Sequence, residues 1–455
     1  MHNLDPFFNP KSVAVIGASR DQQKLGHVIL ENLKISFKGQ LYPINPNAEE
    51  ILGLKAYQSV LDVKEPIDHA VIVVPAEVVN KTISECIKKK IKVASVISSG
   101  FSEIGNKKLE EELKIISKGR IRVLGPNCMA VYKKDLDMIF HPRTRLKRPP
   151  EGFIAFISQS GAFGSILLDS LAYDGVGVST FISLGNKVDV DETELIDYLE
   201  EDTATRCIGM YVETVSRGEE FIKTAKRVAA KKPIVVFKAG KTDRGREAVV
   251  SHTGSLAGPA EIYSAAFKQA GIIEARNSEE LFDLTKALAN LPVMKDNKVC
   301  IVTDGGGFGI VATDAAIMNG LDMNSLSPET TRQLKAFLPP YASINNPIDL
   351  TGDATVERYR KTLETVLKDK NVSGVVVIVL MQIPTLTDEI VDVLRDVKVF
   401  GKPLTVCSAG SQFVLDKNRK LESYGIPTYP TPERAVRALA ALYEYGKIKR
   451  KLTTK

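Results

Sequence analysis

The chain has 455 residues, of which 44% are hydrophobic and 25% charged, and its formal net charge is +6. This length is too great for one ordinary hydrophobic core and predicts about three domains. The mild charge, the lack of tryptophan and the lack of a basic face with interleaved aromatics argue against nucleic-acid binding, and the longest clean apolar run, 375–380, is far too short to cross a bilayer.

The cysteines are five in number, lie far apart and form no Cys-x-x-Cys pair or His/Cys cluster. This spacing argues against structural zinc and a disulfide framework, and it suits a reducing compartment. The amino terminus has no basic region followed by an apolar segment, so no secretory signal is expected. We therefore predict a cytoplasmic protein without a metal site or a membrane segment.

One local pattern starts three times along the chain: an apolar strand, a glycine-rich turn and then a helix. The starts cover 13–19, 153–164 and 299–309. Unbroken apolar strands that alternate with helical patterns are typical of parallel sheets covered by helices on both faces. Periodicity lapses at 141–152 and 292–297, so we predict three doubly wound α/β domains joined there. Further strands are predicted at 70–74, 93–97, 121–124, 178–182, 208–212, 234–237, 375–380 and 404–407.

The first turn carries small and polar residues where a helix is expected to begin, namely Gly17, Ser19, Arg20 and Lys24. Backbone N–H groups at such a turn suit a phosphate. The spacing is not that of GxGxxG, and the second strand runs into Asn45 with no acid to bind a ribose hydroxyl. An NAD-linked redox enzyme is therefore a disfavoured alternative, which a nicotinamide titration would decide.

Other strand ends in this first block carry short loops rich in small residues and proline. Any one of them could be a turn that merely closes a βα unit. Several in one block indicate a rim that suits a long, phosphate-bearing ligand, because ligands of open parallel sheets bind where the strands end. Cys128, beside the last loop, is expected to be packed rather than nucleophilic. The loop residues are Pro75, Ser99, Gly100, Pro126 and Asn127.

The second and third turns place Ser160–Gly161 and 305–307 at predicted helix starts, the first of them covering 162–172. Free backbone N–H groups there form ready anion sites. A close-packed structural turn is an equal alternative for the third turn. The second turn lacks the GxSxG elbow, and 240–242 lacks the upstream glycine of a P-loop, so neither a serine hydrolase nor a P-loop nucleotide site is expected.

The segment 238–258 has neither strand alternation nor a helical apolar stripe, which predicts a long functional loop. It carries His252 among small residues, and an imidazole is a good nucleophile that titrates near neutral pH. Glu213 follows the strand 208–212 and could fix the tautomer of such a histidine. The alternatives are a surface histidine and a solvated acid at a strand end.

Four motifs together resemble one family: VIGAS at 15–19, GPNC at 125–128, SQSGAFG at 158–164 and SHTGSLAG at 251–258. They are similar, in the same order, to motifs of the α subunit of NDP-forming acyl-CoA synthetases. The archaeal ADP-forming acetyl-CoA synthetases are the nearest type, and succinyl-CoA synthetase is related. The resemblance covers essentially the whole chain. It implies an α/β protein with an N-terminal Rossmann-like CoA-binding domain (1–145) followed by two flavodoxin-like, succinyl-CoA synthetase-like parallel-sheet domains (146–293 and 294–455).

The resemblance also implies an acetate–CoA ligase reaction, in which acyl-CoA, ADP and phosphate are converted reversibly to acid, CoA and ATP through an acyl phosphate and a phosphohistidine. His252 would be the phosphorylated nucleophile, and Glu213 would orient and stabilise it. Phosphate would bind at Ser160, Gly161, Gly305, Gly306 and Gly307. Coenzyme A would bind at Gly17, Ser19, Arg20, Lys24, Asn45, Pro75, Ser99, Gly100, Pro126 and Asn127.

A partner is expected because no ATP-grasp domain follows Lys455. The resemblance implies that ADP or ATP, with Mg²⁺, binds to a separate β subunit in an α2β2 heterotetramer. A non-catalytic CoA-binding regulatory protein of the same fold is the alternative, and it would bind CoA without becoming phosphorylated. The motifs select neither the preferred acyl group nor ADP over GDP.

Overall fold

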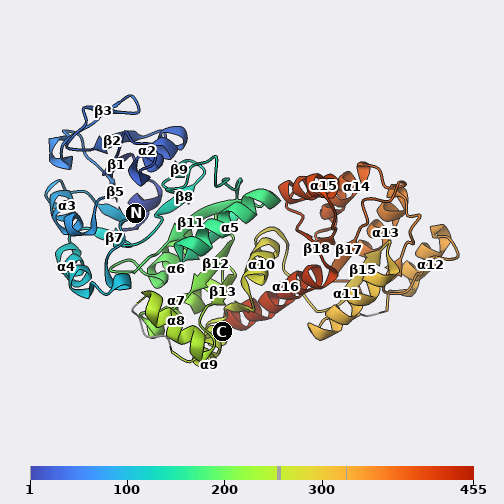
Figure 1. Ribbon diagram of the computed structural model, residues 1–455. Helices are drawn as coiled ribbons and strands as arrows, with labels where there is room; N and C mark the ends of the chain where they lie inside the picture. Colours follow the sequence, from blue (N-terminus) through green and yellow to red (C-terminus); the bar gives the residue numbers. More distant parts are fainter. Residues whose placement is uncertain (1, 254–257, 324, 455) are drawn as a thin grey trace. The chain divides into compact units, whose positions relative to one another are not determined.

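The computed structural model describes residues 2–253, 258–323 and 325–454 (Figure 1). The chain divides into two compact units. The first comprises Met1–Tyr173, Val178–Val228 and Val236–Glu274, and the second comprises Asp174–Gly177, Ala229–Val235 and Ala275–Lys455.

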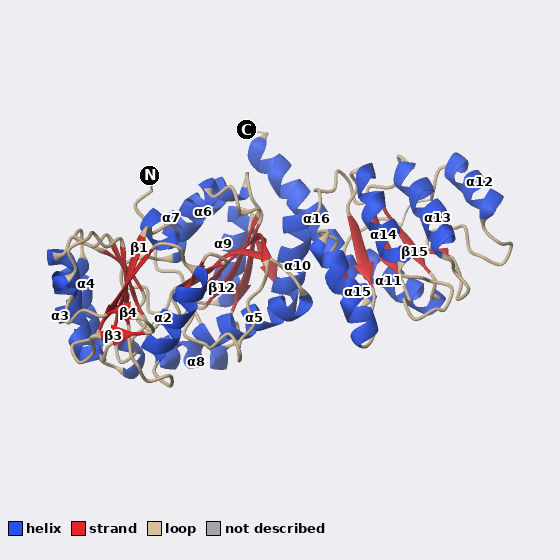
Figure 2. Cartoon of the chain, turned by 90° about the horizontal axis from the view of Figure 1, so that it is seen from above, coloured by secondary structure: helices blue, strands red, loops and turns tan. Residues whose placement is uncertain are grey.

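The first sheet has five parallel strands in the order β2-β1-β5-β6-β7. These strands are Ser12–Ile16 (β1), Gln40–Ile44 (β2), His69–Ile72 (β5), Val93–Val96 (β6) and Arg122–Leu124 (β7). Buried apolar side chains such as Val71 and Val123 fill both faces, as expected for a sheet covered on both sides. Helix α2 (Leu25–Ser36) covers one face, and α3 (Ala76–Lys88) and α4 (Lys107–Ser117) cover the other (Figure 2). A short helix and a two-stranded hairpin complete this part: Asp5–Phe8 (α1), Glu50–Ile51 (β3) and Leu54–Lys55 (β4).

The second sheet has seven strands in the order β14-β13-β12-β10-β11-β8-β9. The central strands are parallel, whereas β8 pairs antiparallel with β11 and β9 pairs antiparallel with β8. The strands are Val131–Lys133 (β8), Leu136–Asp137 (β9), Glu151–Ser158 (β10), Val178–Ser183 (β11), Cys207–Val212 (β12), Ile234–Lys238 (β13) and Ile273–Ala275 (β14). The accompanying helices are Gly161–Asp174 (α5), Glu192–Glu201 (α6), Gly218–Ala229 (α7), Asp243–Thr253 (α8) and Ala260–Ala270 (α9).

Helix α8 corrects one prediction, because most of the segment expected to be a loop (238–258) is helical. Thr242 stands before the helix, and its hydroxyl oxygen accepts a hydrogen bond from the Gly245 N–H at 3.1 Å. Arg244 and Glu247 form an ion pair one turn apart, at 2.8 Å. A threonine cap and charge pairs of this kind favour a helix without an apolar stripe, which is why the periodicity missed it.

The third sheet has five parallel strands in the order β16-β15-β17-β18-β19 and lies in the second unit. Its strands are Val299–Thr303 (β15), Ile348–Asp349 (β16), Gly374–Ile378 (β17), Leu404–Cys407 (β18) and Thr428–Tyr429 (β19). One continuous apolar core joins this sheet to side chains of four helices, α12 to α15. Helix α16 packs on α10, α11 and β18. The helices are Ser278–Asn290 (α10), Gly306–Met318 (α11), Pro328–Phe337 (α12), Val356–Lys368 (α13), Glu389–Asp396 (α14), Gln412–Ser423 (α15) and Pro432–Thr453 (α16).

The predicted α/β class with parallel sheets is confirmed, and every predicted strand coincides with an observed one to within two residues at either end. The strands that the sequence did not predict are short ones, including β16 and β19 at the edges of the third sheet and β8, which lies between β11 and β9. The predicted joins at 145/146 and 293/294 stay predictions, and β8 and β9, which precede the first join, pair with the second sheet. Within the described ranges, no helix combines the length and the apolar character that crossing a membrane requires.

Candidate functional site

A cavity of about 500 Å³ opens at the carboxyl ends of the strands of the first sheet. Six of the ten residues predicted to bind CoA line it: Gly17, Ser19, Lys24, Asn45, Pro75 and Ser99. They come from the ends of four neighbouring strands and from the residues just before helix α2. The cavity therefore lies where parallel sheets bind ligands, at the start of a helix whose N–H groups favour anions.

Two positions of this first turn must be glycine because other backbone atoms lie very close to them. A Cβ on Gly17, which has φ +93°, would overlap the Val73 carbonyl oxygen, and one on Gly26 would overlap the carbonyl oxygen of Gly17. The Asn45 side chain donates to the Ala18 carbonyl oxygen at 2.7 Å and so ties the second strand to the same turn. This turn leaves room for a ligand where side chains would otherwise stand.

The other four predicted CoA residues do not line this cavity. Arg20 extends to the Asn47 carbonyl oxygen at 3.3 Å. Gly100 has φ +111°, and Asn127 donates its N–H to the Ser98 carbonyl oxygen at 2.9 Å. Pro126 precedes Asn127 in the same loop. Arg20 follows β1, whereas Gly100, Pro126 and Asn127 follow β6 and β7. All four keep the status of predictions as CoA ligands.

The second glycine-rich turn begins helix α5 with hydroxyl groups, as predicted. The Ser158 hydroxyl accepts from the Ser160 N–H at 3.2 Å and donates to the Ser160 carbonyl oxygen at 2.7 Å. The Ser160 hydroxyl oxygen accepts from the Phe163 N–H at 3.2 Å. The helix begins at Gly161, one residue before the predicted start. The turn thus presents hydroxyl groups and a helix N-terminus, which together suit a phosphoryl group.

Glu213 lies at the end of the neighbouring strand β12 and is buried, with a relative exposure of 3%. The side-chain oxygen of Gln159 accepts from the Glu213 N–H at 2.6 Å and from the Thr214 N–H at 3.0 Å. The Tyr211 hydroxyl forms a hydrogen bond with the Glu213 carboxylate. Burial raises the pKa of Tyr211, and the Glu213 carboxylate raises it further. The alternative of a solvated acid is therefore wrong, because the Glu213 side chain is buried, and Gln159 holds the backbone of this residue beside the α5 turn.

Lys238 is a residue that the sequence reasoning missed. It ends strand β13, its side chain is 1% exposed, and its ammonium nitrogen lies 4.6 Å from the centroid of the Tyr263 ring. Burial lowers the pKa of Lys238 to about 8, while the Glu213 carboxylate acts in the opposite direction. The signal in the sequence that could have pointed to Lys238 is a lysine at the end of an otherwise apolar strand. A buried cation thus belongs to the electrostatic surroundings of Glu213.

His252 lies in the last turn of helix α8, but its side chain lies outside the described part of the chain, as do residues 254–257. The position of its imidazole relative to Glu213 therefore stays a prediction. Cys128 is 3% exposed, its thiol donates to the Val96 carbonyl oxygen at 3.3 Å, and burial raises its pKa to about 12. This thiol is packed and protonated, not nucleophilic.

The third glycine-rich turn differs from the second, because carboxyl groups surround it. Asp304 precedes Gly305, is 2% exposed, and accepts from the Leu380 N–H at 3.0 Å. A Cβ on Gly306 would lie 2.8 Å from a carboxylate oxygen of Asp349, whereas one on Gly307 would meet open space. Burial raises the pKa of Asp304 to about 6, and the Asp349 carboxylate adds to the rise. Among the described residues, no group of three or more histidine, cysteine or acidic side chains could hold a metal ion.

Three family models match consecutive parts of the chain. A CoA binding domain matches residues 11–134, a succinyl-CoA ligase like flavodoxin domain matches 151–288, and a ligase-CoA domain matches 299–453. The first includes the cavity at Gly17, and the second includes both Glu213 and His252.

Full-length similarity links the chain to named relatives. Acetate–CoA ligase [ADP-forming] I subunit alpha of Pyrococcus furiosus is 41% identical over 465 residues, which cover 99% of both chains. Acetate–CoA ligase [ADP-forming] I of Archaeoglobus fulgidus is 42% identical over 451 residues, and this chain spans 64% of that relative's length. Among solved structures, the dinucleotide forming acetyl-coenzyme A synthetase 1 of Ca. Korarchaeum cryptofilum, in complex with phosphate and ADP, matches with a TM-score of 0.93 and 41% identity over 100% of this chain and 99% of that one.

The family resemblance predicted from four short motifs is therefore confirmed over nearly the whole length of the chain. The architecture agrees with it, since the first and third sheets fall in the first and third matched regions, and all strands of the second sheet except β8 and β9 fall in the second matched region. The chain belongs to the family of ADP-forming acetate–CoA ligases.

Proposed function

We propose that this chain is the α component of an ADP-forming acyl-CoA synthetase, which converts acyl-CoA, ADP and phosphate reversibly to acid, CoA and ATP. The observation that carries the proposal is the pairing, within the first unit, of the cavity at Gly17 with the buried carboxylate of Glu213 beside the hydroxyl-lined start of α5. The names of the relatives favour acetate as the acid.

Coenzyme A is the substrate that the first cavity fits. Its volume of about 500 Å³ lies in the range of small-molecule pockets. The turn at Gly17 brings a helix start to one end of it, and Lys24 supplies a cation there for a phosphate group. Ser19 and Ser99 add hydroxyls that can orient the ligand.

The proposed reaction has three steps. A phosphate oxygen attacks the thioester carbonyl, the C–S bond breaks, and the sulfur takes a proton to leave as the CoA thiol. A nitrogen of His252 then attacks the phosphorus of the acyl phosphate, and the P–O bond breaks so that the acid leaves as a carboxylate. A β-phosphate oxygen of ADP finally attacks the same phosphorus, and the P–N bond breaks. Glu213 would hold the other ring nitrogen, and the start of α5 would stabilise charge on the phosphoryl oxygens.

A separate polypeptide is proposed to hold the nucleotide. One relative covered almost entirely by this chain is named a subunit alpha, and the matching solved structure is described as a complex with phosphate and ADP. We propose a β component with an ATP-grasp domain that binds ADP or ATP with Mg²⁺, in an α2β2 assembly. We place this assembly in the cytoplasm, where the five free and buried cysteines would stay reduced.

The test is acyl-CoA-dependent ATP formation by the chain co-expressed with the ATP-grasp polypeptide of the same organism. Acetyl-CoA, a branched-chain acyl-CoA and an aryl acyl-CoA are compared at equal concentration, with ADP and then with GDP. We expect ATP formation that requires all of acyl-CoA, phosphate and both polypeptides. CoA binding without any ATP formation would instead support a non-catalytic CoA-binding regulatory protein.

The CoA cavity has its own test in a matched pair of glycines with similar backbone angles. Gly17 has φ +93° with the Val73 carbonyl oxygen against it, whereas Gly105 has φ +89° with nothing within 4 Å. Both alanine variants carry backbone strain, but only Gly17→Ala also fills the turn. Isothermal titration calorimetry should show that Gly17→Ala binds CoA about tenfold more weakly than the wild type does, whereas Gly105→Ala binds CoA as the wild type does. Equal affinity of the two variants for CoA would show that CoA does not bind in this cavity.

A further inference from the structure

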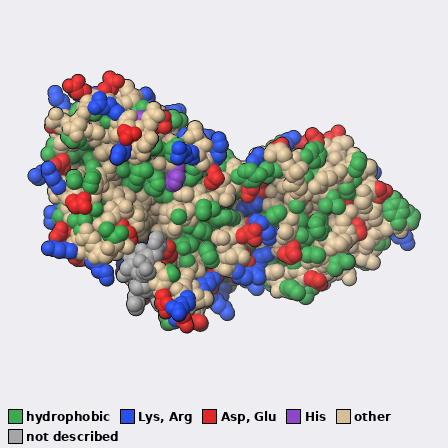
Figure 3. All heavy atoms as spheres, in the orientation of Figure 1, with side chains coloured by type: hydrophobic (Ala, Val, Ile, Leu, Met, Phe, Trp, Pro, Cys, Tyr) green, Lys and Arg blue, Asp and Glu red, His purple; other side chains and the backbone are tan. Residues whose placement is uncertain are grey.

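A buried ion pair lies in the first unit, near the end of strand β12. Lys187, in the loop between β11 and α6, binds Glu192, the first residue of α6, at 3.0 Å. Charged side chains of both signs are spread over the surface seen in Figure 3, whereas the side chains of Lys187 and Glu192 are 8% and 0% exposed. Because burying two charges is costly, such a pair adds little net stability, and a role in placing other groups is the better explanation.

Both members of this pair hold the loop that follows strand β12. The Lys187 ammonium donates to the Thr214 carbonyl oxygen at 2.9 Å. The Glu192 carboxylate accepts from the Ser216 N–H at 3.1 Å. Thr214 is the residue next to Glu213, so the ion pair fixes the backbone directly after the buried carboxylate.

Gln159 connects the ion pair to the start of α5. Its side-chain NH₂ donates to the same Thr214 carbonyl oxygen at 2.7 Å, and its side-chain oxygen accepts from the N–H groups of Glu213 and Thr214. The Thr214 carbonyl oxygen therefore accepts from two side chains, those of Gln159 and Lys187. Of these two donors only Lys187 carries a charge, and hydrogen bonds from charged groups are the stronger kind.

The backbone of Lys187 is itself held in an unusual conformation. Lys187 has φ +60°, in the left-handed region that side chains other than glycine seldom adopt. On one side of it the Asn186 N–H donates to the Pro126 carbonyl oxygen at 2.9 Å, and on the other the Val188 N–H donates to the Gly125 carbonyl oxygen at 3.0 Å. These carbonyls belong to the loop after β7, which carries residues predicted to bind CoA. Lys187 thus links that loop to the loop after β12.

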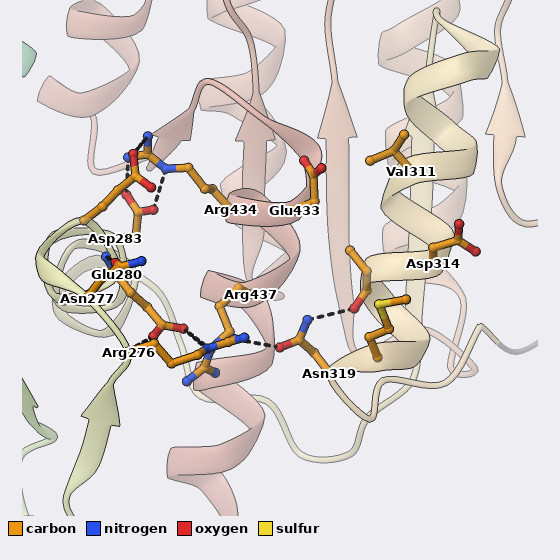
Figure 4. Close-up of a pocket in the computed structure, with 13 residues that line it drawn as sticks. Arg276, Asn277, Glu280, Asp283, Val311, Asp314, Asn319, Glu433, Arg434 and Arg437 are labelled. Carbon is orange, nitrogen blue, oxygen red and sulfur yellow. Dashed lines mark hydrogen bonds and ion pairs between the residues drawn. The ribbon is translucent and has the colours of Figure 1, made fainter. Parts of the chain in front are cut away.

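Ion pairs of the second unit provide a comparison. Arg434 binds Asp283 at 2.7 Å, and Arg437 binds Glu280 at 2.5 Å, beside a groove of about 580 Å³ (Figure 4). Each of these pairs joins helix α16 to helix α10. The pair in the first unit differs, because both of its members bind backbone groups of the loop beside Glu213.

We propose that Lys187 is a positioning residue for Glu213. Its ammonium would fix the Thr214 carbonyl, and with it the strand end that carries the Glu213 carboxylate, while His252 accepts and passes on a phosphoryl group. Glu192 would hold the ammonium in place. The inference rests on the proposed function for the reaction, and it adds a residue that holds the reacting carboxylate in position.

The test measures phosphorylation of the full chain, co-expressed with the ATP-grasp polypeptide, by acetyl-CoA and ³²P-phosphate in rapid-quench experiments. Lys187→Met removes the ammonium and keeps most of the side-chain length. We expect the maximal rate to fall by about 10–100-fold, since small displacements of a positioned group are costly. The acetyl-CoA concentration that gives half the maximal rate should stay unchanged, because Lys187 would not act on binding.

A matched control is a second buried lysine. Lys286, in the second unit, is 9% exposed, binds Glu422 at 2.9 Å and donates to the Thr428 carbonyl oxygen. We expect Lys286→Met to keep the wild-type phosphorylation rate, and an equal loss of rate in both lysine variants would contradict a specific role. The double variant Lys187→Met/Glu192→Gln leaves no buried charge alone, so it should melt at a higher temperature than Lys187→Met and remain as slow. A wild-type rate in this double variant would also contradict the proposal.

Combination with Glu213→Gln shows whether Lys187 acts through Glu213. We expect Lys187→Met/Glu213→Gln to be as slow as Glu213→Gln alone, because losses that share one cause do not add. A further loss of the same size, or a wild-type rate in Lys187→Met, would overturn the positioning role and leave the proposed function in place. No phosphorylation of the wild type would count against the proposed function itself, and with it this role.

Discussion

Two helix starts in this molecule follow the same strand–glycine–helix pattern and nevertheless differ in electrostatics. At α5, Ser158 and Ser160 supply hydroxyls, and Gln159 accepts a hydrogen bond from the backbone N–H of Glu213, whose buried carboxylate lies at the end of the next strand. At α11, the buried carboxyl of Asp304 immediately precedes the turn, and the carboxylate of Asp349 stands against Gly306. The carboxylate beside the first start has a buried cation, Lys238, in its surroundings, whereas the carboxyl beside the second start has another carboxylate, Asp349.

The difference shows that a glycine-rich turn by itself does not define an anion site. Both turns point N–H groups out of a helix, and this favours an anion by a modest amount. A carboxylate a few ångströms away outweighs that preference unless it is protonated or neutralised. The raised pKa of Asp304 indicates that the third turn would accept an anion more readily below about pH 6 than above it.

The largest expected effect is that of Glu213→Gln. This substitution keeps the size of the side chain but removes the charge that would hold the imidazole of His252 in the reactive tautomer. We expect phosphorylation of the chain by acyl-CoA and phosphate to slow by about 10²–10⁴-fold, the scale seen when the orienting acid of a histidine is neutralised. Rapid-quench measurement of bound ³²P gives the rate.

Asp304→Asn is the matched substitution at the third turn, because it too replaces a buried acid with its amide. We expect phosphorylation within a few-fold of the wild-type rate, since this acid lies at the other helix start. Equal losses in the two variants would contradict the distinction between the two turns.

The stability of Asp304→Asn should depend on pH differently from that of the wild type. The pKa of Asp304 is raised from 3.8 to about 6 in the folded chain, so the folded state binds the proton more tightly, and its stabilisation is present at low pH and lost as pH rises through 6. The wild type should therefore lose about 2.4 kcal/mol relative to the variant between pH 4 and pH 7, since each unit of pKa shift is worth about 1.4 kcal/mol. Urea unfolding of both proteins across this range checks the sign, and parallel curves would refute it.

The smallest effect separates two adjacent glycines of the third turn. A Cβ at Gly306 would press on Asp349, whereas a Cβ at Gly307 would meet open space. Gly306→Ala should therefore forfeit part of the roughly 1 kcal/mol that alanine gains over glycine in a helix, because the Asp349 carboxylate must shift, while Gly307→Ala should keep that gain. Thermal unfolding at pH 7 compares the two. Equal stabilities would mean that Asp349 does not crowd the start of α11.

The parallel sheets could be predicted because strands such as β1, β12 and β17 are continuous apolar runs bounded by turn residues. The edge strand β16 could not, since it has only two residues and its register with β15 depends on tertiary contacts. Helix α8 was missed for a related reason, because it is stabilised by a cap and surface charges rather than by an apolar stripe.

The residues of the candidate site could be predicted better than the side chains and hydrogen bonds that surround them. Motifs pointed to Gly17 and Glu213, since backbone turns and strand ends leave local signals. The clamp that Gln159 forms on Glu213, the burial of Lys238 and the crowding of Gly306 by Asp349 join residues tens of positions apart. Local patterns in one sequence hold no information on such pairs, which only the packed fold brings together.

The central claim is that the chain carries a phosphoryl group on His252. The most direct measurement is incubation with acetyl-CoA and ³²P-phosphate, followed by acid and alkali treatment of the isolated chain, for the wild type, His252→Ala and a control at the exposed His2, His2→Ala. The account predicts an acid-labile, alkali-stable label in the wild type and in His2→Ala, and none in His252→Ala. A label of the same stability that persists in His252→Ala would contradict it.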